Sequence, residues 1–119
     1  MTDRPFPSKS LAATLEKLKR TLAQNLGDNL LMVTLYGSHA RGEASKDSDV
    51  DLLVVLKRLT PEAEAQVEQI VYKTMWEINF SCYLSLNLID ESHYRMWERH
   101  RATLLQNIKR DGQILWYRN

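Results

Sequence analysis

The segment from Leu35 to Val55 (LYGSHARGEASKDSDVDLLVV) constrains this chain more than any other part of it. An apolar run ends at Gly37-Ser38, ten residues follow, and Asp49-Val50-Asp51 opens a second apolar run. Side chains alternate between the two faces of a strand, so Asp49 and Asp51 share one face. Two adjacent carboxylates repel each other unless a cation lies between them. The pattern therefore predicts a cation site at the start of a buried strand.

The Gly37-Ser38 turn supplies groups that suit a phosphate. Gly37 allows the backbone to approach a ligand closely, and Ser38 offers a hydroxyl and an N–H group to an anion. Carboxylate oxygens suit Mg²⁺, which usually keeps waters and substrate phosphates among its ligands. Gly37 and Ser38 are thus predicted to hold a phosphate and Asp49 and Asp51 a metal, which is the arrangement of a phosphoryl- or nucleotidyl-transfer site.

The composition is that of an ordinary globular domain and excludes several function classes. We expect the 119 residues to form one domain, with residues 1–7 as a loose tail. The net charge of +1 does not indicate a dedicated nucleic-acid binder, and a single cysteine excludes an internal disulfide. No apolar run approaches the ~18 residues of a membrane span. We therefore expect a cytoplasmic protein without a membrane partner.

The remaining segments predict an alternation of helices and strands. A leucine stripe at spacings of four, three and four predicts a first helix that Ser8 or Ser10 caps and Gly27 ends. Thr60-Pro61 predicts the start of another helix, which runs to about Trp76. The expected order is a helix to Gly27, a strand over 29–36, a helical turn over 38–44, a polar turn over 45–48, a strand over 50–56, a helix over 61–76, a strand over 78–89, one helical region after Asp90 and a short strand over 113–117.

These segments predict an α/β (α+β) sandwich with a small mixed β-sheet and helices packed on one face. The first two strands are too close in sequence for a crossover helix, so we expect them to be antiparallel neighbours. The helix that begins at Pro61 is long enough for a crossover to a parallel strand. The alternation over 78–89 places apolar residues on one face of that strand and polar residues on the other.

The motif resembles the signature of the polymerase-β-type nucleotidyltransferase superfamily: Gly37-Ser38, ten residues, then Asp49-Val50-Asp51. Two short motifs, Ala40-Arg41-Gly42 and residues 48–54 (SDVDLLV), are similar to those of its minimal nucleotidyltransferases. The motif covers about twenty residues, while the order of elements and the small size match along nearly the whole chain. The resemblance implies the polymerase-β-type nucleotidyltransferase fold.

The resemblance also implies an activity and a partner. The family transfers a nucleoside monophosphate, usually AMP from ATP, with Mg²⁺ on the aspartate pair and the triphosphate on the Gly-Ser turn. Stand-alone minimal nucleotidyltransferases are often antitoxins that silence a HEPN-type RNase toxin by AMP transfer (AMPylation). The implied site is Asp49 and Asp51 as catalytic residues and metal ligands, with Gly37, Ser38, Arg41 and Ser48 binding the nucleotide.

The chain departs from the family pattern at the third strand. Active members usually carry a third carboxylate there, which helps to hold metal and can serve as base. The polar face of this strand offers no carboxylate, and Glu77 and Asp90 lie only at the ends of the run. Either another group or a neighbouring copy in a homo-oligomer completes the site, or the chain is a catalytically weak module that binds nucleotide and its partner by contact. A small-molecule nucleotidyltransferase is disfavoured, because no second domain is present to bind the acceptor.

Two of these residues have an alternative structural role. Arg41 either reaches a phosphate or forms an ion pair with Asp47 or Asp49. Ser48 is more often a turn residue than a ligand.

Overall fold

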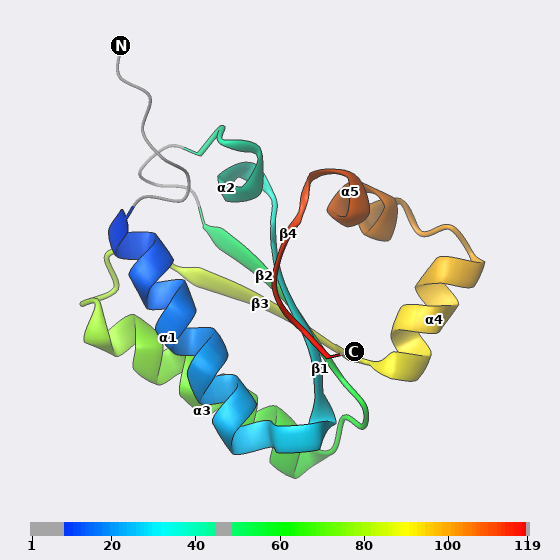
Figure 1. Cartoon of the computed structure of the whole chain (residues 1–119), viewed down its shortest axis with the longest axis horizontal. Coiled ribbons are helices and arrows are strands. Elements are labelled where there is room, and N and C mark those ends of the chain that lie inside the picture. Colours follow the sequence, from blue (N-terminus) through cyan, green and yellow to red (C-terminus); the bar gives the residue numbers. More distant parts are fainter. Residues whose placement is uncertain (1–8, 45–48, 119) are drawn as a thin grey trace.

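The computed structural model describes residues 9–44 and 49–118, which form a sheet with helices on both sides (Figure 1). The predicted order of elements is confirmed except that the single helical region after Asp90 is two helices, while the predicted tail over 1–7 and polar turn over 45–48 lie outside the described residues. In chain order the elements are α1 (Lys9–Leu26), a 3₁₀ turn η1 (Gly27–Asn29), β1 (Leu30–Tyr36), α2 (Ser38–Arg41), β2 (Val50–Leu56), α3 (Pro61–Glu77), β3 (Leu84–Asp90), α4 (Glu91–Arg99), α5 (Thr103–Asp111) and β4 (Gln113–Tyr117).

The strands of the described residues form one mixed sheet in the order β3-β2-β1-β4. β1 is antiparallel to both β2 and β4, as expected for strands without a crossover helix between them. β2 and β3 are parallel, because α3 carries the chain back to the end of the sheet at which β2 begins. The predictions of antiparallel first strands and of a crossover through α3 are both confirmed.

One face of the sheet is covered by α1 and α3. The predicted stripe of α1 (Leu11, Leu15, Leu18 and Leu22) is buried, and Gly27 follows the helix with φ of +54°. Thr60 caps α3 by accepting a hydrogen bond from the backbone N–H of Ala63 at 3.1 Å. The expected cap at Ser8 lies outside the described residues, and Ser10 lies inside the helix rather than at its cap. This layer contains the larger apolar core.

The opposite face is covered by α4 and α5, so the prediction that helices pack on one face is wrong. Met32, Leu53, Val55 and Ile89 of the sheet form a second core with Ile108 of α5, and Trp97 of α4 packs against it. The physical reason lies in β2, where successive residues are apolar and therefore point to both faces. Leu52 and Leu53 are both 0% exposed, which requires a cover on each side of the sheet.

The third strand is shorter than predicted, because its first residues end α3 instead. The N–H of Phe80 donates to the carbonyl of Met75 and that of Asn79 to the carbonyl of Trp76, which is the Schellman pattern of a helix end. Asn79 and Phe80 both have positive φ, of 55° and 52°. The alternation of apolar and polar residues over 78–82 therefore belongs to a turn, and β3 begins at Leu84.

The last helical region is two helices rather than one. Asp90 caps α4 as predicted, its carboxylate accepting a hydrogen bond from the N–H of His93 at 2.9 Å. A second Schellman pattern then ends α4, with Arg101 at φ of 50° and the N–H of Ala102 donating to the carbonyl of Trp97. In the described ranges, no helix is long and apolar enough to cross a membrane.

Candidate functional site

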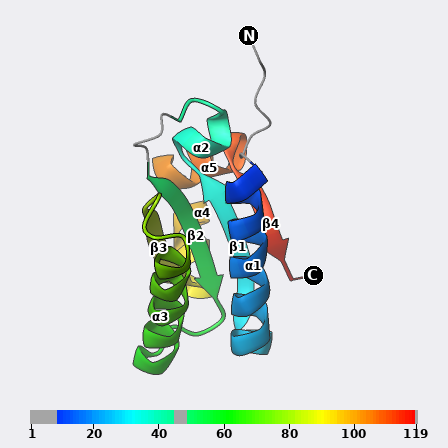
Figure 2. The same ribbon diagram turned by 90° about the vertical axis from the view of Figure 1, so that its left-hand side faces the viewer.

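The residues of the Gly-Ser and aspartate motifs lie together where β1 ends and β2 begins. Tyr36, the last residue of β1, pairs across the antiparallel strands with Asp51. Gly37 follows directly, and α2 covers the ends of both strands (Figure 2). The antiparallel pairing of β1 and β2 therefore brings two motifs that are separated in sequence to one end of the sheet.

Gly37 packs against the Asp51 carboxylate. Its backbone has φ of +78° and ψ of −159°, a region that is essentially reserved for glycine. A Cβ atom at this position would overlap Oδ2 of Asp51 and lie 3.1 Å from its Cγ. The absence of a side chain at residue 37 is thus what allows the carboxylate to lie beside the turn.

A single turn of helix follows Gly37. The carbonyl of Gly37 accepts hydrogen bonds from the N–H groups of Ala40 at 3.1 Å and Arg41 at 3.2 Å. Gly42 ends the turn in the left-handed conformation, at φ of 73°. The predicted helical turn over 38–44 is confirmed, and it comprises Ser38–Arg41.

The two aspartates are close enough to affect each other. Partial burial raises the pKa of Asp51, the negative charge of Asp49 raises it further, and His39 and Arg41 act in the opposite direction. The ionised form of Asp51 is thus less favourable in the protein alone than in a free aspartate. A cation that prefers oxygen ligands would relieve this repulsion, so Asp49 and Asp51 suit a metal such as Mg²⁺.

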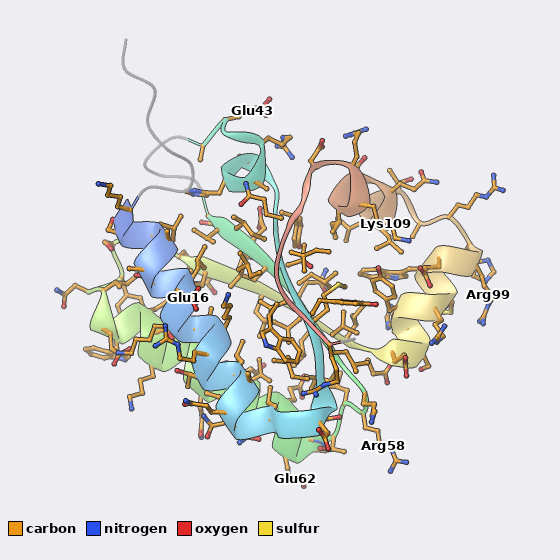
Figure 3. The ribbon with its side chains drawn as sticks, viewed as in Figure 1. Glu16, Glu43, Arg58, Glu62, Arg99 and Lys109 are labelled. Atoms are coloured by element: carbon orange, nitrogen blue, oxygen red, sulfur yellow. The ribbon has the colours of Figure 1, made fainter. Side chains whose placement is uncertain are left out.

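Arg41 forms an ion pair that the sequence did not indicate. Its Nε lies 2.9 Å from Oε1 of Glu43, and both side chains are largely exposed. Glu43 points outward at the surface beside α2 (Figure 3). The sequence suggested Asp47 or Asp49 as the ion-pair partner of Arg41. Among the described residues Arg41 pairs with Glu43 and not with Asp49, and Asp47 lies outside those residues. Ser48, a predicted nucleotide ligand, also lies outside them.

The neighbouring strand β3 lines the same face with uncharged polar groups. Ser85 is the parallel partner of Asp51, and Asn87 is that of Leu53. The two carboxylates at the ends of the predicted third strand lie elsewhere: Glu77 pairs with Lys17 at 3.0 Å, and Asp90 caps α4. Among the described residues, no group of three or more His, Cys, Asp or Glu is arranged to hold a metal ion.

Tyr36 is a site residue that sequence reasoning did not select. Burial raises the pKa of its hydroxyl, as does the charge of Asp51, while a hydrogen bond with the Asn87 side chain lowers it. Tyr36 shares a face of β1 with Met32 and Thr34, since alternate residues point the same way. The alternation of side chains along β1, together with its antiparallel pairing to β2, could have predicted that the Tyr36 ring lies beside the aspartates.

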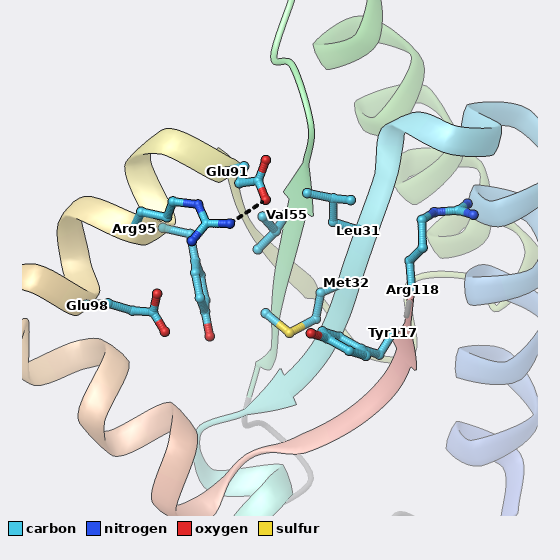
Figure 4. A pocket seen from close by; sticks show the side chains of 9 residues that line it. Leu31, Met32, Val55, Glu91, Arg95, Glu98, Tyr117 and Arg118 are labelled. Carbon is cyan, nitrogen blue, oxygen red and sulfur yellow. Dashed lines mark hydrogen bonds and ion pairs between the residues drawn. The ribbon is translucent and has the colours of Figure 1, made fainter.

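A separate pocket of about 300 Å³ lies between α4 and the sheet (Figure 4). Its lining includes Met32 near the start of β1 and Tyr117 at the end of β4, so it lies roughly 13 Å along β1 from Tyr36. Its Arg95 is paired with Glu91 at 3.1 Å. This pocket is not part of the candidate site.

Comparison with known proteins identifies relatives of this chain. The family described as Nucleotidyltransferase domain matches residues 15–105. Two Methanocaldococcus jannaschii proteins with the name "Putative protein adenylyltransferase", MJ1305 and MJ0141, are 45% identical over 51 residues and 36% identical over 52 residues. These matches cover 43% and 44% of this chain, and the chain spans only 35% and 52% of the two relatives.

The fold also matches a solved structure. A crystal structure described as a toxin–antitoxin with AMP-PNP superposes with a TM-score of 0.54 at 22% identity. The match covers 87% of this chain and 74% of that chain, and it supports the mixed-sheet α+β fold. Since the family match extends over most of the chain and includes both motifs of the site, this chain belongs to the nucleotidyltransferase domain family.

Proposed function

We propose that this protein transfers AMP from ATP to a hydroxyl group of a partner protein in a Mg²⁺-dependent reaction. The observation that carries the proposal is the packing of Gly37 against Asp51, with Asp49 on the same face. This arrangement puts a glycine turn open to a phosphate beside two carboxylates that repel each other without a cation.

Each site residue has a distinct role in this proposal. Gly37 and Ser38 bind the triphosphate through the backbone and the Ser38 hydroxyl. Asp49 and Asp51 hold Mg²⁺, which neutralises phosphate charge and orients the phosphates when it is bound. Arg41 and Ser48 contact the nucleotide, and Arg41 must leave Glu43 to do so.

The transfer itself is a displacement at the α-phosphorus. The acceptor oxygen forms a bond to that phosphorus, the bond to the bridging oxygen breaks, and pyrophosphate leaves while the acceptor proton passes to water. Catalysis of such a reaction consists mainly of positioning and charge stabilisation. The rigid pairing of β1 with β2 provides the positioning.

A HEPN-type RNase toxin is the proposed acceptor. The family resemblance of the Gly37 and Asp49 motifs supports it, as does the similarity of the fold to a toxin–antitoxin structure. The names of the two Methanocaldococcus jannaschii relatives support a protein acceptor.

A second candidate function is a binding module that neutralises its partner by contact. It is favoured by the face of β3 next to Asp51, where Ser85 and Asn87 stand in place of a carboxylate. Fewer negative charges would hold a second Mg²⁺ ion weakly, which would lower the rate of transfer.

Label transfer separates the two functions. The protein is incubated with Mg²⁺, ATP labelled at the α-phosphate and a HEPN-type toxin protein as the acceptor. We expect label on the partner, loss of label with the double variant Asp49→Asn/Asp51→Asn, and full label with Asp28→Asn, a control at an exposed aspartate. A partner that is neutralised equally by the double variant, without label, would refute the enzymatic proposal and establish the contact module.

A further inference from the structure

Three aromatic side chains form an exposed cluster at the end of α3. Tyr72, Trp76 and Phe80, here called the aromatic cluster, pack edge to face with ring centroids 5.5–6.3 Å apart. They are 53%, 60% and 43% exposed. Contiguous exposed apolar area of this kind is typical of a surface that another molecule covers.

The aromatic cluster borders a groove beside an open edge of the sheet. The groove, of about 640 Å³, runs between α3 and β3 and is here called the β3 groove. β3 is the outermost strand of the sheet formed by the described residues, on the side away from β4 (Figure 2). Its outer N–H and C=O groups can pair with an added strand. The lining of the groove includes Tyr72, Met75, Tyr83, Leu84, Ser85 and Leu86.

The groove also carries negative charge. Glu64, Glu68, Tyr72 and Trp76 follow one another at intervals of four along α3 and therefore share one face of the helix. In the part of the chain that the structure describes, neither Glu64 nor Glu68 forms an ion pair. A second copy of the chain would bring the same acidic helix, whereas a partner with Lys or Arg would complement it.

We propose that the β3 groove binds an extended segment of a partner protein that carries both apolar and basic side chains on the face turned towards the groove. The segment adds a strand to β3 through main-chain hydrogen bonds, which is a known mode of peptide recognition. On that face, which takes every second residue of the segment, apolar side chains cover the aromatic cluster and Leu86, and a basic side chain pairs with Glu68.

The bound segment would lie next to the candidate site. Ser85 lines the groove and is also the strand partner of Asp51. An added strand lies roughly 10 Å from β2, which is two strand spacings. Binding itself does not depend on nucleotide transfer, so this proposal stands or fails independently of the proposed function.

Synthetic peptides test the proposal. A fluorescein-labelled nonapeptide is titrated with the protein, and fluorescence polarisation gives its affinity. Its odd positions, which share one face of a strand, are Val and Lys in turn, and its even positions are Thr. We expect binding, and a loss of about tenfold in affinity with Trp76→Ala, as for an aromatic side chain at the centre of an interface. Ile114→Ala is the matched control, because Ile114 is 62% exposed on β4, the opposite edge strand, and should leave the affinity unchanged.

Charge and backbone variants sharpen this test. Glu68→Lys should weaken binding of the basic peptide and strengthen binding of an otherwise identical peptide with Glu in place of Lys. Methylation of the peptide backbone nitrogens on one edge should abolish binding if a strand is added. Equal affinity for both peptides, no binding at millimolar concentration, or amide shifts on β4 instead of β3 would overturn the proposal. Self-association that Trp76→Ala abolishes would assign the groove to a second copy and overturn it as well.

Discussion

At the scale of single residues, the candidate site combines a conformational requirement with an electrostatic one. Gly37 has a positive φ that disfavours side chains, and its Cα faces the Asp51 carboxylate. Asp51 in turn bears a charge that burial and Asp49 disfavour. The two features indicate that this end of the sheet is arranged for a ligand at some cost in stability.

Gly37→Ala should therefore impair the site more than a comparable change elsewhere. The variant adds about 1–3 kcal/mol of backbone strain and displaces the Asp51 carboxylate. We expect loss of Mg²⁺-dependent ATP binding, measured by calorimetry. The control is Gly27→Ala, where φ is +54° but a Cβ would meet no atom within 4 Å. If both variants bind ATP equally well, contact with Asp51 is not what constrains residue 37.

Asp51→Asn should stabilise the protein in the absence of metal. The pKa of Asp51 is raised in the folded state, so its ionisation at neutral pH opposes folding, and the penalty disappears as the pH falls through the folded pKa. Thermal unfolding without Mg²⁺ should show a higher Tm for the variant at pH 7 and no difference at pH 3. Added Mg²⁺ should raise the Tm of the wild type only, and a variant less stable than wild type at pH 7 would contradict this account.

At the scale of elements, the capping residues explain which helix boundaries can be predicted from the sequence and which cannot. Thr60 and Asp90 are residue types that commonly cap helices, and both do so here. The end of α4 has no such signal, because Arg101 occupies the left-handed position that glycine or asparagine usually takes. Asn79 does occupy that position after α3, but the regular alternation over 78–82 favoured a strand.

The Asp90 cap gives a prediction with a pH dependence. Asp90→Ala should lower the free energy of unfolding by about 1 kcal/mol at pH 7, and Asp90→Asn should retain most of the stability. Hydrogen bonds from the His93 N–H and the Ser92 hydroxyl lower the pKa of Asp90, so its contribution is present at neutral pH and is lost as the pH falls through the folded pKa. Urea unfolding at pH 7 and pH 3 measures both effects. A deficit for Asp90→Ala that stays the same at pH 3 would contradict the cap.

In the candidate site, too, some contacts could be predicted from the sequence and others could not. The association of Gly37 with Asp51 followed from the motif and from two adjacent antiparallel strands. The Arg41–Glu43 pair and the Tyr36–Asn87 contact did not, because they depend on side-chain directions that no spacing specifies. The uncharged face of β3 was predicted correctly from its alternation, although the strand is shorter than expected.

At the scale of the whole molecule, one sheet separates two apolar cores. The larger core contains Leu22 of α1 and the second contains Ile108 of α5. The candidate site lies at the end of the sheet, where β1 and β2 meet α2. Both layers therefore contribute to the rigidity of the strands that carry it.

Variants in the two cores should be nearly additive. Leu22→Ala and Ile108→Ala should each lower the free energy of unfolding by about 2–5 kcal/mol, since Leu22 is 0% and Ile108 is 5% exposed. The residues share no core cluster, so the double variant should lose close to the sum. Chemical unfolding followed by circular dichroism provides the three values. A loss well below the sum would show that the two cores are energetically coupled.

The sheet topology has a consequence for the order of folding. Pairing of β1 with β2 closes the connection over residues 37–49, whereas pairing of β2 with β3 closes residues 57–83. The second closure costs about 0.6 kcal/mol more, because its loop is roughly twice as long. In pulse-labelled hydrogen exchange during refolding, we expect amides of β1 and β2 to become protected before those of β3. The end of the sheet that carries the candidate site would then form before the edge that we propose as a docking strand.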